Sequence, residues 1–557
     1  MQKSCTQCAA GFDVTEDDLA FYEKVSPVFN GKKELIPPPK QCPLCRLRRR
    51  LTFRNPIHVF LRNSSLSGKQ IFSMWPENTA FPVYSNGEWW GEAWDPLQYG
   101  IQADPRSSFF EQFASMKEKI PHYALSVGIT ENSDYCNNAN HLKNCYMVFN
   151  TEHAEDGMYC EMMNSSRSCL DCTYTSNSEL CYQCIWCSHC YDVQNAEDCD
   201  NCSESAFLLQ CRSCTHCFGC VNLRHKNYCI FNEQKTKEEY EHFIGQLKTE
   251  SHAWHTEMKR KFREFCLQFA RPHAVAINAL DASGNHMTNV RNVSDSFYAA
   301  DAEFLSNCLN IFEASHCRDY SVWGAHAEQI YEAISCGTNV QNLLFCYECW
   351  DGSSDLQYCF NCIGCQYCFG CCNLQKKSFC IFNKKYSKEE YDILVPEIIE
   401  QMRKTGEWGE FFPMRIAPGP YNCSIAQRYF PLTKEEAKEQ GLRWYDEELP
   451  EAPLAIDASK LPDALPAIDD AIIVQSEQSK KPFKITSQEI KRYRQFHVPL
   501  PRTTYDERME ERTKKLGGIR LYDRTCAKTG KPIKTAYPPD SPWIVWDKDT
   551  YDQEFGG

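Results

Sequence analysis

Two pairs of cysteines near the start of the sequence have the spacing of metal ligands. Cys5 and Cys8 enclose two residues, and Cys42 and Cys45 enclose two more. A turn of this kind directs two thiolates at one ion, and two such turns complete a tetrahedral site of four sulfurs. Zinc is the metal expected at a closed structural site, although iron accepts the same ligands. Four unrelated buried cysteines are the alternative interpretation.

The segment that follows the second pair is strongly basic and contains no acidic residue. It favours either of two interpretations, a phosphate-binding edge beside the metal or a solvated helix face that balances an acidic chain. Nucleic-acid contact is therefore a second alternative for the function. The five residues that would make it are Arg46, Arg48, Arg49, Arg50 and Arg54.

Most of the 35 cysteines fall in two arrays. Sixteen lie between Cys136 and Cys229, with every gap a multiple of three, and twelve lie between Cys308 and Cys380. From Cys169 onward the first array also recurs after 30 residues. A fixed period is typical of stacked repeats, and residues three apart share a face only if corners intervene. The arrays therefore predict β-solenoid coils of 12, 15 or 18 residues, with thiols inside and asparagines at the corners: Asn144, Asn201, Asn307 and Asn361.

The array thiols have three possible roles. They can be small apolar groups in a core too thin for leucine, zinc ligands, or ligands of an iron–sulfur cluster. Leu208 and Ser353 stand at array positions that are cysteine elsewhere, which favours a core. Disulfides are expected only if the chain enters an oxidising compartment.

Both arrays end in closely similar sequence, CFGCVNLR…YCIFN, at an offset of 151 residues. Each is followed by a capping box that starts a helix, Thr236 with Glu239 and Ser387 with Glu390. Behind the first helix a stripe of apolar residues is expected to pack against the array: Trp254, Met258, Phe262, Phe265 and Phe269.

The C-terminal residues repeat the pattern of the N-terminal module without its ligands. Ser476 and Ser479 correspond to the first cysteine pair at an offset of 471, and Thr504 and Glu507 to the second at an offset of 462. Serine and threonine are poor zinc ligands, so this copy is expected to fold without metal.

These observations predict a mainly β protein with flanking helices, in which two cysteine-rich solenoid-like arrays lie between a zinc ribbon of treble-clef type and its degenerate copy. The expected modules are a zinc ribbon with a basic helix and aromatic strands (1–103), a helical linker (104–130), the first array (131–232), a helical hairpin (233–272), the second array (273–384), a helix with a proline-rich connector (385–470), and the degenerate, metal-free copy (471–557).

The segments CTQCAAGFDVTEDDLAFYEK and CPLCRLRRR resemble "probable zinc-ribbon" domains. With the CFGCVNLR and YCIFN motifs, the chain resembles an uncharacterised, cysteine-rich, zinc-ribbon-bearing family of candidate-phylum bacteria. The resemblance implies zinc at Cys5, Cys8, Cys42 and Cys45, and it implies no activity. Relatives often carry a second set of cysteine pairs where this chain has Ser64, Ser67, Ser85 and nearby Glu88, which argues against a second zinc there.

Composition limits the remaining choices. The 557 residues carry a net charge of −14 and no apolar run that could span a membrane, so we expect a cytoplasmic protein with reduced thiols. The array histidines form no catalytic set with a carboxylate, so an enzyme is not expected. The favoured function is a zinc-binding scaffold with an unknown protein partner, and the alternative is a metal or redox protein that uses the array thiols. The oligomeric state is left open.

Overall fold

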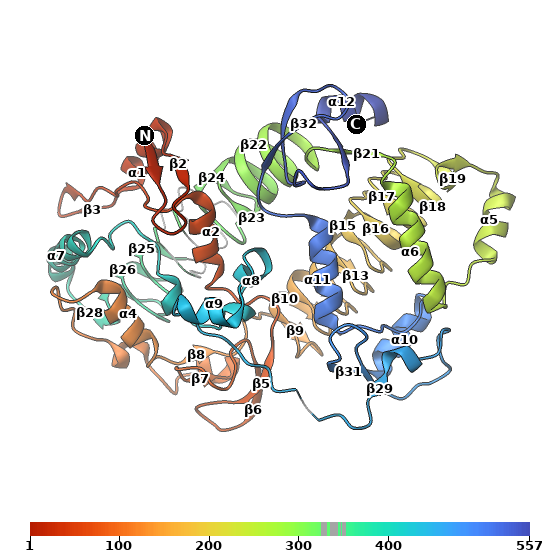
Figure 1. Cartoon of the computed structure of the whole chain (residues 1–557). Coiled ribbons are helices and arrows are strands. Elements are labelled where there is room, and N and C mark those ends of the chain that lie inside the picture. Colours follow the sequence, from red (N-terminus) through yellow and green to blue (C-terminus); the bar gives the residue numbers. More distant parts are fainter. Residues whose placement is uncertain are drawn as a thin grey trace. The chain divides into compact units, whose positions relative to one another are not determined.

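A computed structural model describes residues 1–324, 331, 332, 334, 344, 345, 347, 352–449 and 451–556. The chain forms two compact units, each built from two separate stretches of sequence (Figure 1). Unit 1 comprises Met1–Leu125 and Ala276–Tyr445, and unit 2 comprises Ser126–Val275 and Asp446–Gly557. Each unit thus joins one cysteine array to the terminal module that lies farther away along the chain.

Unit 2 contains the first array and the C-terminal module. Its elements are β9 (Thr130–Glu131), β10 (Asn137–Lys143), β11 (Phe149–Glu155), β12 (Glu161–Asn164), β13 (Ser166–Arg167), β14 (Thr173–Ser176), β15 (Ile185–Ser188), β16 (Tyr191–Glu197), β17 (Ser203–Leu209), β18 (Thr215–Val221), β19 (Asn227–Ile230), β20 (Glu233–Gln234), α5 (Lys237–Gly245), α6 (His252–Cys266), β21 (Ala270–Pro272), β29 (Ile456–Asp457), η4 (Ala458–Lys460), β30 (Ile472–Gln475), β31 (Pro482–Ile485), α10 (Ser487–Gln495), α11 (Tyr505–Leu516), β32 (Tyr522–Thr525), β33 (Pro532–Thr535), β34 (Ile544–Trp546) and α12 (Lys548–Phe555).

Unit 1 contains the N-terminal module and the second array. Its elements are β1 (Gln2–Ser4), β2 (Gly11–Asp13), α1 (Glu16–Val25), β3 (Val28–Phe29), β4 (Lys32–Lys33), α2 (Pro43–Leu51), β5 (Phe60–Asn63), β6 (Gln70–Ser73), β7 (Val83–Tyr84), α3 (Asn86–Trp89), η1 (Pro96–Tyr99), α4 (Phe109–Lys117), β8 (His122–Tyr123), β22 (Ala276–Ser306), β23 (Leu309–Phe312), β24 (Ser315–Arg318), β25 (Ser354–Gln357), β26 (Gln366–Phe369), β27 (Ser378–Ile381), β28 (Lys384–Lys385), α7 (Lys388–Thr405), η2 (Met414–Ile416), η3 (Tyr421–Cys423), α8 (Ile425–Tyr429) and α9 (Lys434–Glu439).

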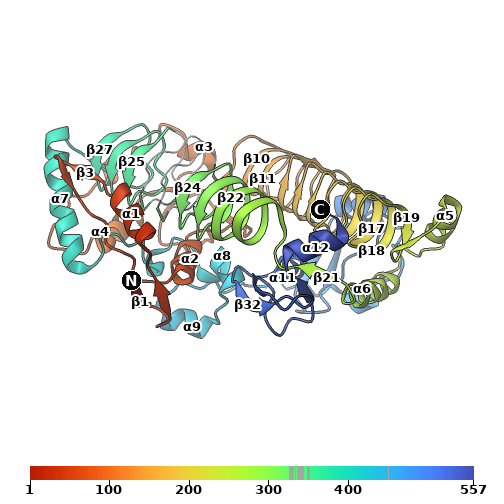
Figure 2. The ribbon, with the colours of Figure 1, turned by 90° about the horizontal axis from the view of Figure 1, so that it is seen from above.

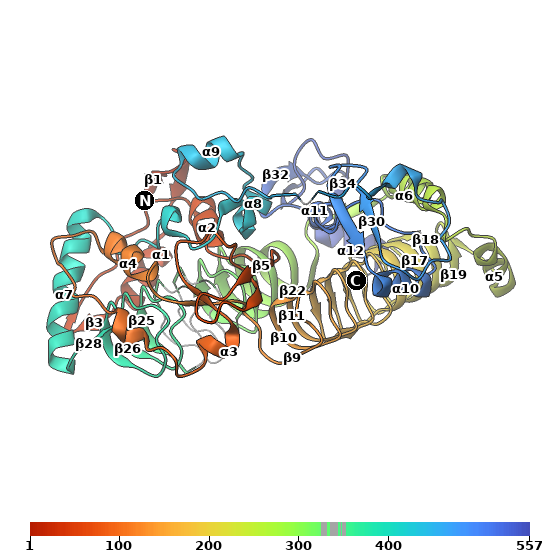
Figure 3. The same ribbon diagram turned by 90° about the horizontal axis from the view of Figure 1, so that it is seen from below.

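The arrays are β-solenoids, as the sequence predicts, and the coil length of the first is 12 residues. Its strands pair in parallel with partners 12 positions away, as in the ladder from Glu161 through Thr173 and Ile185 to Glu197. The coils stack in chain order from β9 to β19 (Figure 2, Figure 3). The 30-residue recurrence is two and a half coils, so it is a recurrence of residue type at the inward positions and not the structural period.

A corner at every third residue produces this coil. From Asn138 to Phe231, every third residue has a positive φ, and Gly219 is the only glycine among them. Left-handed backbone costs an ordinary residue about 1–2 kcal/mol, so the coil needs compensation at each corner. The hydrogen-bond ladder supplies it, since corner N–H groups donate to the preceding coil, as Asn144 does to the carbonyl of Glu131 at 2.9 Å. The asparagines expected at corners, Asn144 and Asn201 among them, do have positive φ.

The inward thiols are buried and bonded to their own backbone. The Cys172 thiol donates to the carbonyl of Leu170 at 3.5 Å and accepts from the N–H of Cys184 at 3.5 Å. The Ser178 hydroxyl makes the same two bonds, to Ser176 and from Cys190, at 2.8 and 3.0 Å. Cysteine here is therefore the apolar member of a set with serine and threonine, each tying its coil to the next.

Part of the second array has longer coils. The described residues Arg318, Tyr331, Leu344 and Gln357 are neighbours at intervals of 13, whereas the corresponding residues of the first array, from Leu170 through Tyr182 and Gln194 to Ala206, are 12 apart. Three added residues return the array to its original phase, because the inward positions recur every three residues. Cys336, Cys346 and Cys349 lie outside the described residues.

The expected helix starts and the apolar stripe are confirmed. Thr236 and Ser387 cap α5 and α7 through complete capping boxes. In α6, Phe262 contacts Phe207 of the first array and Phe265 contacts Phe231, with ring centroids 5.8 and 5.2 Å apart. Among the described residues, no helix is both long and apolar enough to cross a membrane.

The buried thiols predict that the protein loses stability in alkali. Burial raises the pKa of Cys145 and of Cys187 to about 11, against 9.0 without the fold. Below pH 9 these thiols are neutral in both states. Between pH 9 and 11 they ionise only when unfolded, so the free energy of unfolding should fall by about 1.4 kcal/mol per pH unit for each such thiol. Urea titrations at intervals from pH 8 to 11 measure this slope.

The matched control is Cys187→Ser, which keeps both hydrogen bonds and removes one titrating group. Its stability should fall less steeply than that of the parent protein over the same interval. Equal slopes for the two proteins, or no loss of stability up to pH 11, would contradict neutral buried thiols.

Candidate metal centre and buried arginine clusters

The N-terminal module brings Cys5, Cys8, Cys42 and Cys45 together. The first pair lies on the turn between β1 and β2, where the N–H of Ala9, a residue of positive φ, donates to the carbonyl of Cys5. The second pair lies at the start of α2, with Cys42 as the residue before the first turn and Pro43 at the first helical position. Proline there loses no hydrogen bond, so the helix begins where the thiols are needed.

The geometry of the four sulfurs fits one ion. All four lie within 4.8 Å of one another, and the Sγ atoms of Cys8 and Cys42 are 3.8 Å apart. Four sulfurs placed tetrahedrally at about 2.3 Å from zinc would be about 3.8 Å apart. Cys5 and Cys42 are buried and Cys8 is exposed, so the site lies at the surface with one side shielded.

The protein environment treats the thiols differently. Burial raises the pKa of Cys5, but N–H groups of Cys42, Cys8 and Gln7 outweigh it and hold that pKa at about 6. Burial raises the pKa of Cys42 and, together with its hydrogen bond to Cys8, that of Cys45. The donor set is therefore four crowded sulfurs without a nearby base or substrate cavity, which suits structural metal binding better than catalysis.

Three further turn pairs have the same spacing but are closed by hydrogen bonds to a carboxylate. The Ser64 hydroxyl donates to Glu88 at 2.5 Å, that of Ser476 to Glu507 at 2.7 Å, and that of Thr529 to Asp547 at 3.1 Å. Hydrogen bonds from Ser64, Ser67 and Ser85 outweigh the effect of burial and lower the pKa of Glu88 to about 2. The third cluster, with Cys526 and Asp547, could have been found from the similarity of TGK at 529–531 to SGK at 67–69.

The basic segment points into the protein. Arg46, Arg49, Arg50 and Arg54 are buried, and only Arg48 is half-exposed. Arg46 makes a two-pronged contact with Asp319 of the second array at 2.8–3.2 Å, and Arg50 approaches the same carboxylate at 3.4 Å. Arg49 pairs with Glu332 and Glu410, each at 2.7 Å. The arginines of α2 therefore anchor the N-terminal module to the array.

The same arrangement recurs in unit 2. Arg508 and Arg512 of α11, at an offset of 462 from Arg46 and Arg50, both contact Asp171 of the first array, at 3.0 and 2.9 Å. Arg512 also donates to Thr173 at 3.1 Å, as Arg50 does to Ser321 at 3.2 Å. Each unit is thus held by two arginines and one buried aspartate.

These contacts bear on the predicted nucleic-acid face. A guanidinium that is buried and paired with carboxylates cannot also reach a phosphate, so the arrangement favours the structural interpretation of residues 46–54. Nucleic-acid binding by the chain as a whole stays a prediction. The sequence gave no sign of Asp319 or Asp171, because an isolated acidic residue in an array looks like any solvated one.

Other possible ligand groups are weaker. Among the described residues, one more cluster could hold an ion, the exposed set of His141, Glu152 and His153 on adjacent coils. The two imidazole rings are stacked 4.4 Å apart. No group of three described array cysteines has its sulfurs within 4.8 Å of one another in this way, so the arrays do not form a further cluster of that kind.

Comparisons with known proteins add little. No family model matches the chain, and no curated protein matches it. Among solved structures, a protein described as a candidate acetyltransferase from Desulfovibrio desulfuricans aligns over 47% of this chain and 70% of its own, with 9% identity and a TM-score of 0.10, which is too low to carry an argument. The comparisons do not support the resemblance to a family of candidate-phylum bacteria, and what stands is the four-cysteine cluster that could bind a metal.

Removing the shared carboxylate tests the arginine clusters. Asp319→Asn should cost about 3–5 kcal/mol, because Arg46 and Arg50 stay buried without their counter-charge. Urea unfolding measures the loss, and hydrogen exchange of α2 locates it. In the control, Glu257→Gln removes an exposed partner of Arg260, and its effect should not exceed about 1 kcal/mol. Equal effects of the two substitutions would mean that the buried pair does not hold the module.

Removing one thiol tests the metal centre. Cys5→Ser should speed hydrogen exchange of β1, β2 and residues 38–45 at least tenfold, because so small a module has little core without its ion. Helix α2 should stay protected, since Arg46 and Arg49 still anchor it to the array. Unchanged exchange of the β1–β2 hairpin would show that no ion organises it.

Proposed function

We propose that the protein is a zinc-binding scaffold, in which a structural zinc organises the N-terminal module and the solenoids present long surfaces to a protein partner. The observation that carries this is the contrast between two kinds of cysteine. Four sulfurs converge within 4.8 Å near the N-terminus, whereas the array thiols are bonded to backbone inside their coils. The first set fits an ion and the second fits a core.

Zinc is the ion proposed for the four cysteines. When bound, it would supply charge neutralisation and cross-linking and no reaction step, because all four positions are filled by protein. Cys5 and Cys8 would hold the β1–β2 turn, and Cys42 and Cys45 would hold the start of α2. The cytoplasm, where thiols stay reduced, is the compartment consistent with this use of cysteine.

The recurrence of the same contacts supports internal duplication as the origin of the scaffold. The two arrays share their closing sequences, and the two anchoring helices share their paired arginines. A gene that doubled a ribbon-and-array unit needs only one metal site to survive if the other turns are closed by hydrogen bonds, as at Glu507.

Metal analysis of protein purified without added metal tests the proposal. We expect about one zinc per chain, lost in Cys8→Ser. Cys187→Ala should keep the zinc, because that thiol is a core group, and His153→Ala should keep it too if the exposed histidine cluster is not the site. With a thiol reagent under native conditions, a chelator should release at most the four N-terminal cysteines.

Two outcomes would favour the alternatives. Several metals per chain, or iron absorbance, with array cysteines freed by the chelator in groups of three or four, would favour a metal or redox protein. A zinc content that survives both Cys8→Ser and Cys42→Ser would remove the proposed site altogether.

A further inference from the structure

The two solenoids end in the same three residues, but only one end is covered. Ile381, Phe382 and Asn383 of the second array have no exposed surface. Their counterparts in the first array at an offset of 151, Ile230, Phe231 and Asn232, are half-exposed. The sequences are identical at these positions, so the difference lies in what packs on them.

In unit 1 the cover is an extended stretch, residues 96–102. The N–H of Ile101 donates to the carbonyl of Phe382 at 3.0 Å, and the amide of Asn383 donates to the carbonyl of Pro96 at 3.1 Å. Leu97 packs against the end of the solenoid core. At Gly100 a side chain would have its first carbon 2.5 Å from the carbonyl oxygen of Asn383, so only glycine fits this approach. Beyond it, the side chain of Gln102 accepts a hydrogen bond from Lys384.

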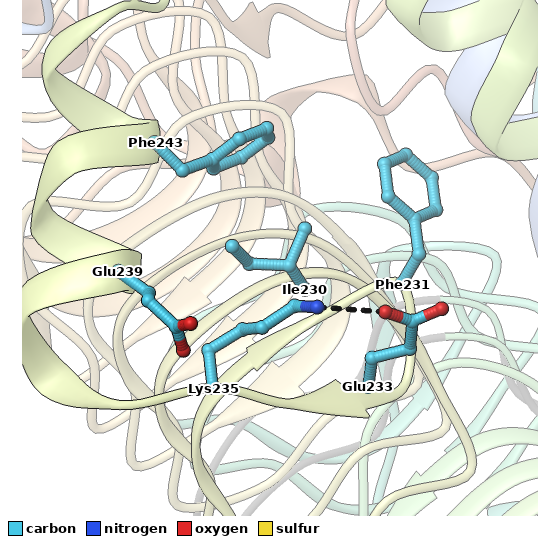
Figure 4. Close-up of a pocket in the computed structure, with 6 residues that line it drawn as sticks. All are labelled: Ile230, Phe231, Glu233, Lys235, Glu239 and Phe243. Atoms are coloured by element: carbon cyan, nitrogen blue, oxygen red, sulfur yellow. Dashed lines mark hydrogen bonds and ion pairs between the residues drawn. The ribbon is translucent and has the colours of Figure 1, made fainter.

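In unit 2 the matching end is preformed and open. The side chain of Asn232 exchanges hydrogen bonds with the backbone of Val221 at 2.8 and 3.0 Å, as Asn383 does with Cys372. Within the described part of the chain, nothing donates to the carbonyl of Phe231. Beside it lies a cavity of about 390 Å³, lined by Ile230, Phe231, Glu233, Lys235, Glu239 and Phe243 (Figure 4).

The charge at the rim differs from that in unit 1. Glu233 stands where the second array has Lys384, and Glu239 lines the same cavity. Lys235 neutralises part of this charge through its 2.8 Å contact with Glu233. An occupant that carries a cation at the place of Gln102 would therefore be favoured, because two carboxylates face it against one ammonium.

We propose that this groove at the end of the first array binds an extended segment of a partner protein, of the pattern Leu-x-x-Gly-Ile followed by a basic residue. The partner's isoleucine N–H donates to the carbonyl of Phe231, and the Asn232 amide donates to a partner carbonyl at the position of Pro96. The leucine covers the end of the core, and the glycine passes over Asn232. This is recognition by an exposed strand end, with main-chain bonds for affinity and pockets for specificity.

The inference deepens the proposed scaffold function and rests on it for the existence of a partner, but it is independent of the metal. Loss of zinc in Cys8→Ser leaves the groove in unit 2 untouched. A failed peptide test with one zinc per chain would overturn the groove assignment alone, and successful binding with no zinc would overturn the metal centre alone.

The experiment uses two labelled peptides and the full chain. One peptide copies residues 95–103, and the other carries Gln102→Lys. Fluorescence polarisation should show saturable binding of both, with the lysine peptide binding at least about threefold more tightly. Gly100→Ala in the peptide should weaken binding at least tenfold, because its methyl group would meet the carbonyl of Asn232. This change is in the ligand, so it cannot impair folding of the protein.

Paired protein variants locate the site. Phe243→Ala, on the groove wall, should weaken binding at least tenfold, whereas Leu394→Ala, its counterpart in unit 1, should leave it unchanged. Glu233→Lys should remove the preference for the lysine peptide while both peptides still bind. A photo-crosslinker at the place of Tyr99 should attach within residues 230–243.

Several results would overturn the inference. These are no saturable binding, equal affinity of the Gly100→Ala peptide, or crosslinks to residues 381–394 of unit 1. Self-association of the protein that the peptides fail to reverse and that Phe243→Ala abolishes would assign the groove to a second copy of the chain and not to a partner.

Discussion

The step of three residues between corners is the constraint on which both solenoids depend. With a positive φ at every third residue, one side chain in three points inward, and four of them fill each 12-residue coil. So thin a core accepts only small side chains, and each must also serve the backbone groups beside it. Cysteine meets both needs, because its thiol is apolar enough for a core and still donates to the carbonyl two residues back. The abundance of cysteine thus follows from coil geometry.

The second requirement is that something cover the flanks of the coils. Both units use a helix whose arginines reach a buried aspartate at a corner, Asp319 in one and Asp171 in the other. A buried charge pair is a weak source of net stability, but it is specific, because any other register leaves charges unpaired. Helix α2 carries a second duty, since its first turn also holds Cys42 and Cys45. The metal centre and the docking contact are therefore parts of one rigid element.

What could be predicted from sequence follows the range of the interactions. The four-cysteine cluster and the capping boxes depend on residues close together or in recognisable pairs, and the step of three in the arrays already requires corners. The coil length was out of reach, because 12, 15 and 18 all keep the inward positions in phase. The arginines were interpreted as exposed because the partner of Arg46 lies 273 positions away. The open end of the first array could be recognised only by comparison with its covered counterpart.

The 13-residue coils of the second array show how such a fold changes length. A solenoid built on triplets behaves like a reading frame: one added residue shifts every later side chain from the inside to a corner, two do so again, and the third restores the phase. The three long coils between Arg318 and Gln357 are such a set, and beyond them the cysteines Cys359 to Cys371 point inward as their counterparts do. Natural variation in the length of these arrays is thereby quantised, with whole coils or compensated triplets as the permitted steps.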